Sequence, residues 1–236
     1  MNQLISALAS KYPADQRTDE WKLQRLGFLT GSAFGKLMGA SRTKGEKFSK
    51  TALDAIYRIA SERMLDAYTI ENAAMWQEYE QQTSVWSKAM QFGTDHETEA
   101  RDYYTLITGR DVTETGSIPS DIVEWVSASP DGLIDDNGRL GVWECKCPLP
   151  ATFVRYMVEI HDADSLRKVN PDYYWQVQCE MFVTGASFCD FSVYSPFLNK
   201  SMHIVRIERD EQAIKEIVAK AIEVNEFISE IMNLNN

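Results

Sequence analysis

Hydrophobic residues along this chain recur with two periods, one typical of strands and one typical of helices. The clearest strand pattern spans 129–148, where apolar and polar residues alternate on either side of a polar turn at 135–138. This pattern predicts a β-hairpin in which one strand ends at Leu133 and Ile134 and the other covers 140–147. Shorter patterns of the same kind predict further strands at 112–117, 125–127, 188–194 and 203–207.

Apolar residues spaced three and four apart predict helices at 51–66, 69–106, 151–160 and 171–184. The last of these follows Asn170, a typical capping residue, and begins with Pro171. Proline is tolerated at the first position of a helix because the N–H that it lacks has no partner within the helix. An amphipathic pattern over 210–233 predicts a C-terminal helix whose apolar face packs in the core or against another subunit. Together these elements predict an α/β fold, with a central mixed β-sheet flanked by α-helices.

Length and composition indicate a globular protein. The chain has 236 residues, 44% of them hydrophobic and 25% charged, so we expect one domain over 1–236 with a sizeable core. Residues 1–18 predict an arm or helix ending near Pro13, and 161–170 predict a polar loop. The sequence has no run of about 18 apolar residues and no secretion signal, so we expect no membrane segment. Its four cysteines lack a Cys-x-x-Cys pair, which favours a reducing, cytoplasmic location.

The net charge of −11 bears on possible partners. Proteins that coat nucleic acid without specificity are normally basic, so this class is disfavoured. An enzyme that acts on DNA needs positive charge only at its site, so this class stays open.

The predicted hairpin brings three chemically useful side chains together. Side chains alternate along a strand, so Glu144 and Lys146 project to the same side, roughly 7 Å apart at two residues of rise. Asp131, at the end of the facing strand, can meet both of them. The opposite side of the second strand can be buried and carries Trp143, Cys145 and Cys147.

Two carboxylates beside an ammonium suit metal-assisted hydrolysis of a phosphodiester. Mg²⁺ prefers oxygen ligands and keeps waters that a substrate phosphate can displace, so Asp131 and Glu144 are candidate ligands. Lys146 could orient the attacking water, or deprotonate it if its pKa were lowered. The alternative is a surface Glu–Lys pair beside an ordinary Asp-Gly turn, because short motifs also recur by chance.

A second candidate site is a phosphate pocket near the N-terminus. The segment 19–32 could be anchored by its apolar residues Trp21, Leu23 and Leu26, which would leave Arg25 free. Thr30, Gly31 or Ser32 could cap the helix that follows, and a helix N-terminus with a hydroxyl and an arginine binds phosphate well. Ordinary capping beside a solvated arginine is the alternative.

Other segments add weaker signals. The Gly/Ser-containing stretch 39–50 has the only concentration of basic residues, which suits contact with phosphates or simple solvation: Arg42, Lys44, Lys47 and Lys50. Glu97 falls on a predicted helix and could supply a third carboxylate. Gln176 lies one turn into the helix that begins at Pro171 and could face the site.

Taken together, these residues resemble a known family. Asp131, Glu144 and Lys146 match the PD-(D/E)xK signature of the restriction-endonuclease-like nucleases. More narrowly, the chain is similar to the viral recombinases of the phage lambda exonuclease-like family, and the matching blocks are 21–32, 92–97, 129–133, 144–148, 174–178 and 207–211. Residues 1–18 and 60–88 show no clear match.

The resemblance implies a Mg²⁺-dependent nuclease that processively degrades the 5′-ended strand of linear double-stranded DNA. It implies a ring-shaped homotrimer, two metals per site with Mn²⁺ as a substitute, and a single-strand annealing protein as a partner in phage-type DNA recombination. By position, the implied metal ligands are Asp131, Glu144, Glu97 and the backbone carbonyl of Cys145, with Lys146 serving the water. The implied 5′-phosphate-binding residues are Arg25, Ser32, Ser129 and Gln176. Arg42 takes the place of a groove-inserting arginine, and Met90 that of the strand-separating wedge, which is Leu in the family.

Three other interpretations remain. The same core could belong to an endonuclease or to an iron–sulfur exonuclease, although the latter needs four thiolates around one cluster. A DNA-end-binding recombination accessory with an idle site is the second, although every expected ligand is present. An unrelated acidic interaction protein is the third, and it would require all the matching blocks to be coincidental.

Overall fold

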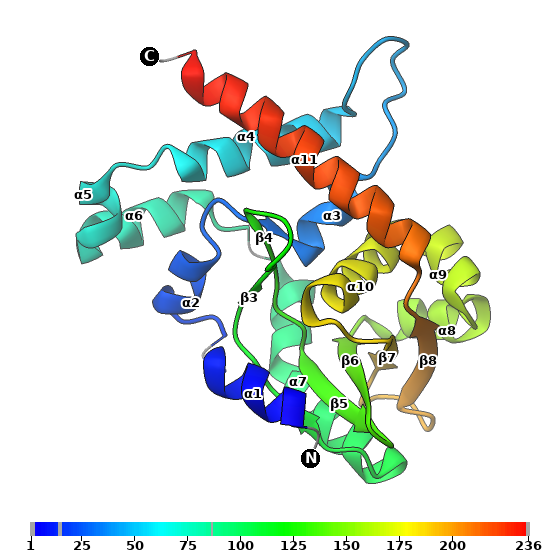
Figure 1. Ribbon diagram of the computed structural model, residues 1–236. Coiled ribbons are helices and arrows are strands. Elements are labelled where there is room, and N and C mark those ends of the chain that lie inside the picture. The colour runs from blue at the N-terminus through cyan, green and yellow to red at the C-terminus, as the bar shows by residue number, and fades with distance from the viewer. Residues whose placement is uncertain (1–2, 14–15, 86, 235–236) are drawn as a thin grey trace.

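The computed structural model describes residues 3–13, 16–85 and 87–234. Its centre is a five-stranded mixed sheet with the order β2-β5-β6-β7-β8 (Figure 1). Strands β6 and β7 are parallel, and the other neighbours are antiparallel. The predicted α/β fold with a central mixed sheet is therefore confirmed. The strands are β2 (Val112–Thr113), β5 (Gly132–Asp136), β6 (Arg139–Lys146), β7 (Phe188–Tyr194) and β8 (Met202–Glu208).

The predicted hairpin is formed by β5 and β6. The pairing runs from Gly132 with Trp143 to Asp136 with Arg139. The turn residues Asn137 and Gly138 have φ angles of 54° and 87°. Two consecutive positive φ angles define the tight hairpin turn that Asn-Gly favours. The turn is therefore shorter than the predicted 135–138 and lies inside it.

A second sheet of three short strands was only partly predicted. It has the order β1-β4-β3. Strand β4 corresponds to the prediction at 125–127, whereas the predicted strand 112–117 is reduced to the two residues of β2. The two outer strands were not predicted, because two residues are too short to show alternation. The bounds are β1 (Leu29–Thr30), β3 (Ile118–Pro119) and β4 (Val126–Ala128).

The helices agree with the sequence pattern except in three regions, one of which is the short helix Asp19–Gln24, which was not predicted. Residues 161–170 were predicted to be a loop, but they contain a helix whose N-terminus is closed by a capping box between Asp162 and Ser165. The predicted helical stretch 69–106 is divided into separate helices. The helices are α1 (Gln3–Lys11), α2 (Asp19–Gln24), α3 (Gly31–Leu37), α4 (Lys50–Arg63), α5 (Ala67–Glu71), α6 (Ala73–Thr83), α7 (Lys88–Thr108), α8 (Pro150–Glu159), α9 (Ala163–Val169), α10 (Pro171–Thr184) and α11 (Glu211–Asn233).

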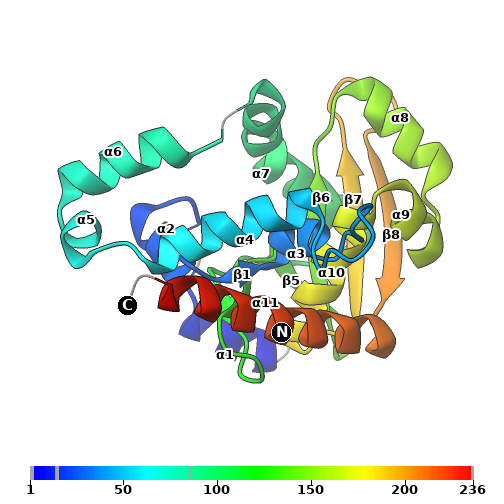
Figure 2. The same ribbon diagram turned by 90° about the horizontal axis from the view of Figure 1, so that it is seen from above.

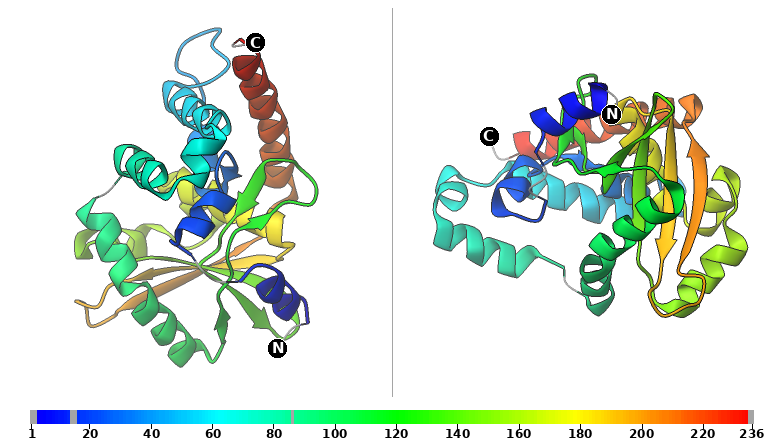
Figure 3. Two further views of the ribbon diagram at one scale, coloured as in Figure 1. Left: turned by 90° about the vertical axis from the view of Figure 1, so that its left-hand side faces the viewer. Right: turned by 90° about the horizontal axis from the view of Figure 1, so that it is seen from below.

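Helices cover both faces of the large sheet (Figures 2 and 3). The larger core joins one face to α3, α4, α8, α10 and α11, and the smaller core joins the other face to α7. Helices α5 and α6 extend away from the sheet, beside α2 and α4 (Figures 1 and 2). In the described parts of the chain, none of the helices has the length and apolarity needed to cross a membrane.

The apolar face of α11 is part of the protein's own core. Its fully buried residues belong to the larger cluster, namely Ala213, Ile214, Ile217, Ala221, Val224 and Ile228. Of the two predicted uses of this face, core packing is confirmed. The pattern of α11 therefore gives no support to subunit packing.

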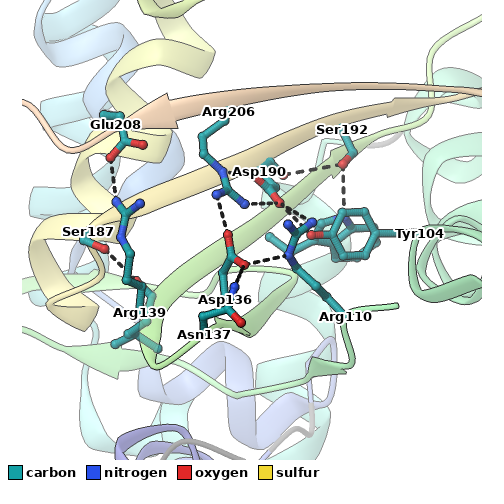
Figure 4. A network of polar contacts seen from close by, with 12 residues as sticks. Tyr104, Arg110, Asp136, Asn137, Arg139, Ser187, Asp190, Ser192, Arg206 and Glu208 are labelled. Atoms are coloured by element: carbon teal, nitrogen blue, oxygen red, sulfur yellow. Dashed lines mark hydrogen bonds and ion pairs between the residues drawn. The ribbon is translucent and has the colours of Figure 1, made fainter. Parts of the chain in front are cut away.

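A network of polar contacts joins the strands at the end of the sheet away from Lys146 (Figure 4). Asp190 of β7, 2% exposed, accepts two hydrogen bonds from the Arg206 guanidinium at 2.8 and 3.0 Å and one from Tyr104 Oη at 2.7 Å. Arg206 also reaches Asp136 at 2.5 Å, and Arg110 lies 3.4 Å from Asp136. These contacts tie α7, β5, β7 and β8 together, so the network is structural.

Candidate active site

Asp131 and strand β6 form the centre of the candidate site. Asp131 directly precedes β5 and lies opposite Glu144, since Gly132 pairs with Trp143 across the hairpin. The backbone N–H of Cys145 donates a 2.8 Å hydrogen bond to Oδ2 of Asp131. The backbone of β6 therefore holds the aspartate beside the glutamate, as the hairpin prediction required.

Glu144 and Lys146 share one face of β6, and Gln176 of α10 joins them. Nζ of Lys146 forms an ion pair with Oε1 of Glu144 and donates to Oε1 of Gln176 at 3.3 Å. Nε2 of Gln176 donates to Oε1 of Glu144 at 2.6 Å. The opposite face of the strand packs in the smaller core through Trp143 and Cys145. The predicted cluster of two carboxylates and an ammonium is present, and an amide links its members.

Glu180 is a buried acid in this cluster that the sequence did not identify as a site residue. It lies one turn after Gln176 on α10, is 1% exposed, and accepts a 2.9 Å hydrogen bond from Nε2 of Gln176. Oε2 of Glu180 and Oε2 of Glu144 are both buried without a hydrogen-bond partner among the described residues. The available signal was the spacing of four from Gln176, which puts both side chains on one helix face.

The charges of the cluster perturb one another. Burial, and then repulsion from Glu144, raises the pKa of Asp131 and of Glu180 well above their ordinary values. Burial lowers the pKa of Lys146, but the carboxylates of Glu144 and Asp131 outweigh it and hold that pKa above its usual range. Nζ of Lys146 also lies 4.9 Å from the ring centroid of Tyr173. In this arrangement Lys146 is an ammonium suited to orienting a water, without the lowered pKa that deprotonating one would require.

Glu97 of α7 lines a cavity that Asp131 and Lys146 also line. The cavity has a volume of about 540 Å³. The Glu97 side chain is 19% exposed, and its carboxylate forms an ion pair with Arg17, which lies between α1 and α2. The predicted third carboxylate is therefore at the site, held by an arginine that the sequence did not single out.

The donor set fits Mg²⁺ held by few protein ligands. Across 3–13, 16–85 and 87–234, no three His, Cys, Asp or Glu side chains are gathered into a ready-made metal site. Mg²⁺ is usually bound through one or two carboxylates and completes its shell with waters and substrate oxygens. Asp131 and the unpartnered Oε2 of Glu144 can supply those carboxylate oxygens, and Cys145 follows Glu144 on β6 and donates its backbone N–H to Asp131.

A second cavity adjoins the first and contains two of the four predicted phosphate-binding residues. It has a volume of about 420 Å³ and is lined by Arg25 and Ser32, and Met90 lines both cavities. The Arg25 guanidinium carbon lies 3.9 Å from the ring centroid of Trp21. Burial, and then repulsion from Arg58, lowers the pKa of Arg25 to about 10. Arg25 is thus anchored by the indole and, among the described residues, forms no ion pair with a carboxylate, although the charge of Glu62 acts to raise its pKa.

The other two predicted phosphate-binding residues do not line this cavity. Oγ of Ser129 is buried and has no hydrogen-bond partner among the described residues. The amide of Gln176 is engaged by Glu144, Lys146 and Glu180. In this structure Gln176 belongs to the acidic cluster, and phosphate binding by Ser129 and Gln176 stays a prediction.

Comparisons with known proteins agree with this geometry. The YqaJ-like viral recombinase domain matches residues 20–187, which is more than half of the chain. The chain belongs to this family. Among solved structures, it is similar to an alkaline exonuclease, LHK-Exo, from Laribacter hongkongensis, with 29% identity, a TM-score of 0.73, and coverage of 92% of this chain and 96% of that one.

Two further structures resemble this recombinase-family chain. One is LHK-Exo in complex with dAMP, with 29% identity, a TM-score of 0.70, and coverage of 92% and 98% of the two chains. The other is a phage-related exonuclease from Haemophilus somnus 129PT, whose 15% identity and TM-score of 0.64 over 88% and 96% of the chains support the fold alone. Curated protein sequences gave no match. The family and the exonuclease neighbours together indicate a nuclease.

One predicted DNA contact, Arg42, lies outside both cavities. Arg42 lies in the exposed loop between α3 and α4, which projects beside α11 (Figure 1). It lines a separate cavity of about 560 Å³ with Lys36 and Lys50. The lining of this cavity combines these three basic side chains with the acidic Glu46 and Asp172, and groove insertion by Arg42 stays a prediction.

The cysteines of this recombinase-family chain do not form a cluster. Cys145, Cys147, Cys179 and Cys189 are all free and buried. The first two pack in the smaller core and the other two in the larger core, on opposite faces of the sheet. An iron–sulfur exonuclease needs its thiolates around one centre, so this alternative is not supported.

Proposed function

We propose that this protein is a Mg²⁺-dependent exonuclease that degrades the 5′-ended strand of linear double-stranded DNA, processively and in the 5′→3′ direction. The observation that carries the proposal is the pair of adjoining cavities. One contains Asp131 and Lys146, the other contains Arg25, and Met90 lies in the wall of both. A strand end could therefore place its terminal phosphate beside Arg25 and its first internal phosphodiester beside Asp131.

The catalytic roles follow from the donor set. Asp131 and Glu144, with the carbonyl of Cys145, would hold one Mg²⁺, and Glu97 would help to hold a second after leaving Arg17; Mn²⁺ is expected to substitute. The metal would lower the pKa of bound water and neutralise phosphate charge. Lys146 would orient that water as a hydrogen-bond donor, since its own pKa is raised.

Direction would come from recognition of the 5′ end. A terminal phosphomonoester carries more negative charge than an internal diester, and the planar guanidinium of Arg25 can bind two of its oxygens at once. Hydrolysis exposes a new 5′-phosphate at each step, so the same pocket can draw in the shortened strand. The dAMP bound by LHK-Exo is a 5′-mononucleotide, the kind of product such a reaction releases. Met90, 56% exposed at the start of α7, would separate the strands, and Arg42 would contact the duplex.

Processivity would come from a ring-shaped homotrimer around the DNA. We infer this assembly from the family resemblance, since the buried face of α11 does not support it. Three chains of 26.9 kDa should give a mass near three times that value in light scattering. A monomeric protein that still degrades long DNA without release would contradict the ring. The 3′ tails would pass to a single-strand annealing protein in the cytoplasm of a bacterial or phage-infected cell.

The competing function is an endonuclease on the same core. The test uses linear duplexes with 5′-phosphate or 5′-hydroxyl ends beside a closed circle, each with Mg²⁺ or with EDTA. We expect rapid loss of the phosphorylated linear duplex, slower loss of the hydroxyl form, and an intact circle. Arg25→Ala should slow the phosphorylated duplex about tenfold or more and leave the hydroxyl duplex nearly unchanged, because one charge-assisted contact contributes ~1.5–3 kcal/mol. Cleavage of the circle would instead favour the endonuclease.

A further inference from the structure

The cavity that contains Arg25 is lined by Lys22, Arg25 and Arg58 and by the carboxylates of Glu62 and Glu80, and several of its residues carry buried hydrogen-bond donors that have no partner among the described residues. Across the described residues, three buried side-chain nitrogens lack a hydrogen-bond partner, and all three belong to residues that line this cavity: Nε1 of Trp21, Nε of Arg25 and Nε1 of Trp76. Trp76 is only 4% exposed. Buried donors are normally paired, so an unpaired group calls for a functional explanation. Three of them around one cavity fit a ligand with several acceptor oxygens.

Arg58 adds positive charge to the same wall. It lies on α4, its side chain is 53% exposed, and it pairs with Glu62 one turn later. Glu62 also accepts a 2.9 Å hydrogen bond from the backbone N–H of Gly27, which keeps the carboxylate in place independently of the arginine. Only the arginine end of this pair is exposed, since the Glu62 side chain is 11% exposed, so Arg58 can turn from Glu62 towards a more highly charged anion while Glu62 keeps its bond from Gly27.

Helix α6 supplies the side of the cavity that faces α2 and α4. Trp76, Tyr79 and Thr83 lie in this wall, and the rings of Trp76 and Tyr79 are 5.7 Å apart. The helix extends away from the sheet (Figures 1 and 2), so it contributes nothing to the acidic cluster. Part of the segment 60–88 therefore lines the cavity that contains Arg25.

We propose that Arg58 and Trp76 are specificity-determining residues that bind, together with Arg25, the terminal 5′-phosphomonoester of a DNA strand. This inference rests on the proposed recognition of 5′ ends and extends it to two residues on α4 and α6. A phosphomonoester offers three outer oxygens, enough for two guanidinium groups and an indole N–H. A 5′-hydroxyl end would leave these donors unpaired, and the cavity would discriminate against it for that reason.

Equilibrium binding without cleavage tests the proposal. Blunt duplexes that differ only in a 5′-phosphate or 5′-hydroxyl are titrated in EDTA and followed by fluorescence anisotropy. The readout is the ratio of the two dissociation constants, hydroxyl over phosphate. Arg58→Gln and Trp76→Phe are compared with wild type, Arg25→Ala and Arg58→Lys. The matched control is Arg155→Gln, which removes an exposed arginine from another i,i+4 pair, with Glu159 on α8.

We expect Arg58→Gln to reduce the ratio about tenfold and Trp76→Phe to reduce it about threefold. Arg58→Lys should reduce it by less than Arg58→Gln, because lysine keeps the positive charge but lacks the two parallel N–H donors of the guanidinium. Arg155→Gln should keep the wild-type ratio. If Arg25→Ala collapses the ratio while Arg58→Gln and Trp76→Phe retain it, this inference is wrong and 5′-end recognition stands. A wild-type ratio of one would refute both. Circular dichroism and melting curves confirm that each variant is folded.

Discussion

Replacing Glu180 with glutamine is expected to stabilise the metal-free protein at alkaline pH. Glu180 is 1% exposed, and its Oε2 has no hydrogen-bond partner among the described residues. Glutamine keeps the Oε1 acceptor that Gln176 uses at 2.9 Å and removes the buried negative charge beside Glu144. Because glutamine puts an uncharged amide nitrogen in place of Oε2, the gain comes from removing an uncompensated buried charge, worth ~1–3 kcal/mol. For a chain of this size that corresponds to ~2–12 °C in melting temperature.

The pH dependence gives this prediction a definite sign. Burial and the charge of Glu144 raise the pKa of Glu180 in the folded protein, so between its unfolded pKa of about 4.3 and its folded pKa the folded state binds the extra proton. The stability linked to this proton is complete below about pH 4 and is lost as the pH rises through the folded pKa. The advantage of Glu180→Gln should therefore be small at pH 5 and grow towards pH 8.

The assay is thermal unfolding in EDTA at several pH values, followed by tryptophan fluorescence. Glu230→Gln is the matched control, because it removes an exposed carboxylate from α11. Its melting temperature should follow that of wild type at every pH. Destabilisation of Glu180→Gln at pH 8, or an advantage that shrinks as the pH rises, would refute the account of Glu180 as an uncompensated buried acid.

Three further predictions concern other parts of the molecule. Lys146→Ala should lower the single-turnover cleavage rate about a hundredfold or more, equivalent to ~3 kcal/mol in the barrier, and leave DNA binding nearly unchanged; near-normal turnover would contradict its role. Asp190→Asn should lower the free energy of unfolding, measured in urea, by ~3 kcal/mol, because it weakens a buried ion pair with Arg206. The control Glu208→Gln breaks only an exposed pair with Arg139 and should lower it by less than ~1 kcal/mol. Equal losses would show that the network does not stabilise the fold. Arg17→Ala should release Glu97 from its ion pair and so tighten Mn²⁺ binding severalfold, as measured by calorimetry. An unchanged affinity would show that Arg17 does not compete with the metal for Glu97.

The hairpin and its chemistry were predictable because their determinants are local. Alternation along β6 fixes which side chains share a face, and the Asn137–Gly138 turn fixes the register with β5. Asp131, Glu144 and Lys146 could therefore be placed together from the sequence. The helix α9 was missed because it has only seven residues and one buried side chain, although the capping spacing of Asp162 and Ser165 was a usable signal.

The parts of the site that could not be predicted depend on contacts between distant segments. The pair Arg17–Glu97 joins residues 80 positions apart, and no pattern in either segment indicates it. Arg58 and Trp76 lie on helices that only the tertiary fold brings beside Arg25. Gln176 was correctly placed near the site, but its bonds to Glu144 and Glu180 follow from how α10 packs on the sheet.

We propose above that the cluster of Asp131, Glu144 and Lys146 removes nucleotides from the 5′ end of a duplex strand. The most direct measurement follows one linear duplex whose 5′-phosphorylated strand carries a radioactive label at either its 5′ or its 3′ end, with Mg²⁺. We expect the 5′ label to appear at once as a mononucleotide and the 3′ label to stay on a shortening strand. Lys146→Ala should slow both changes about a hundredfold or more. Early release of the 3′ label, or undiminished release by Lys146→Ala, would contradict this proposal.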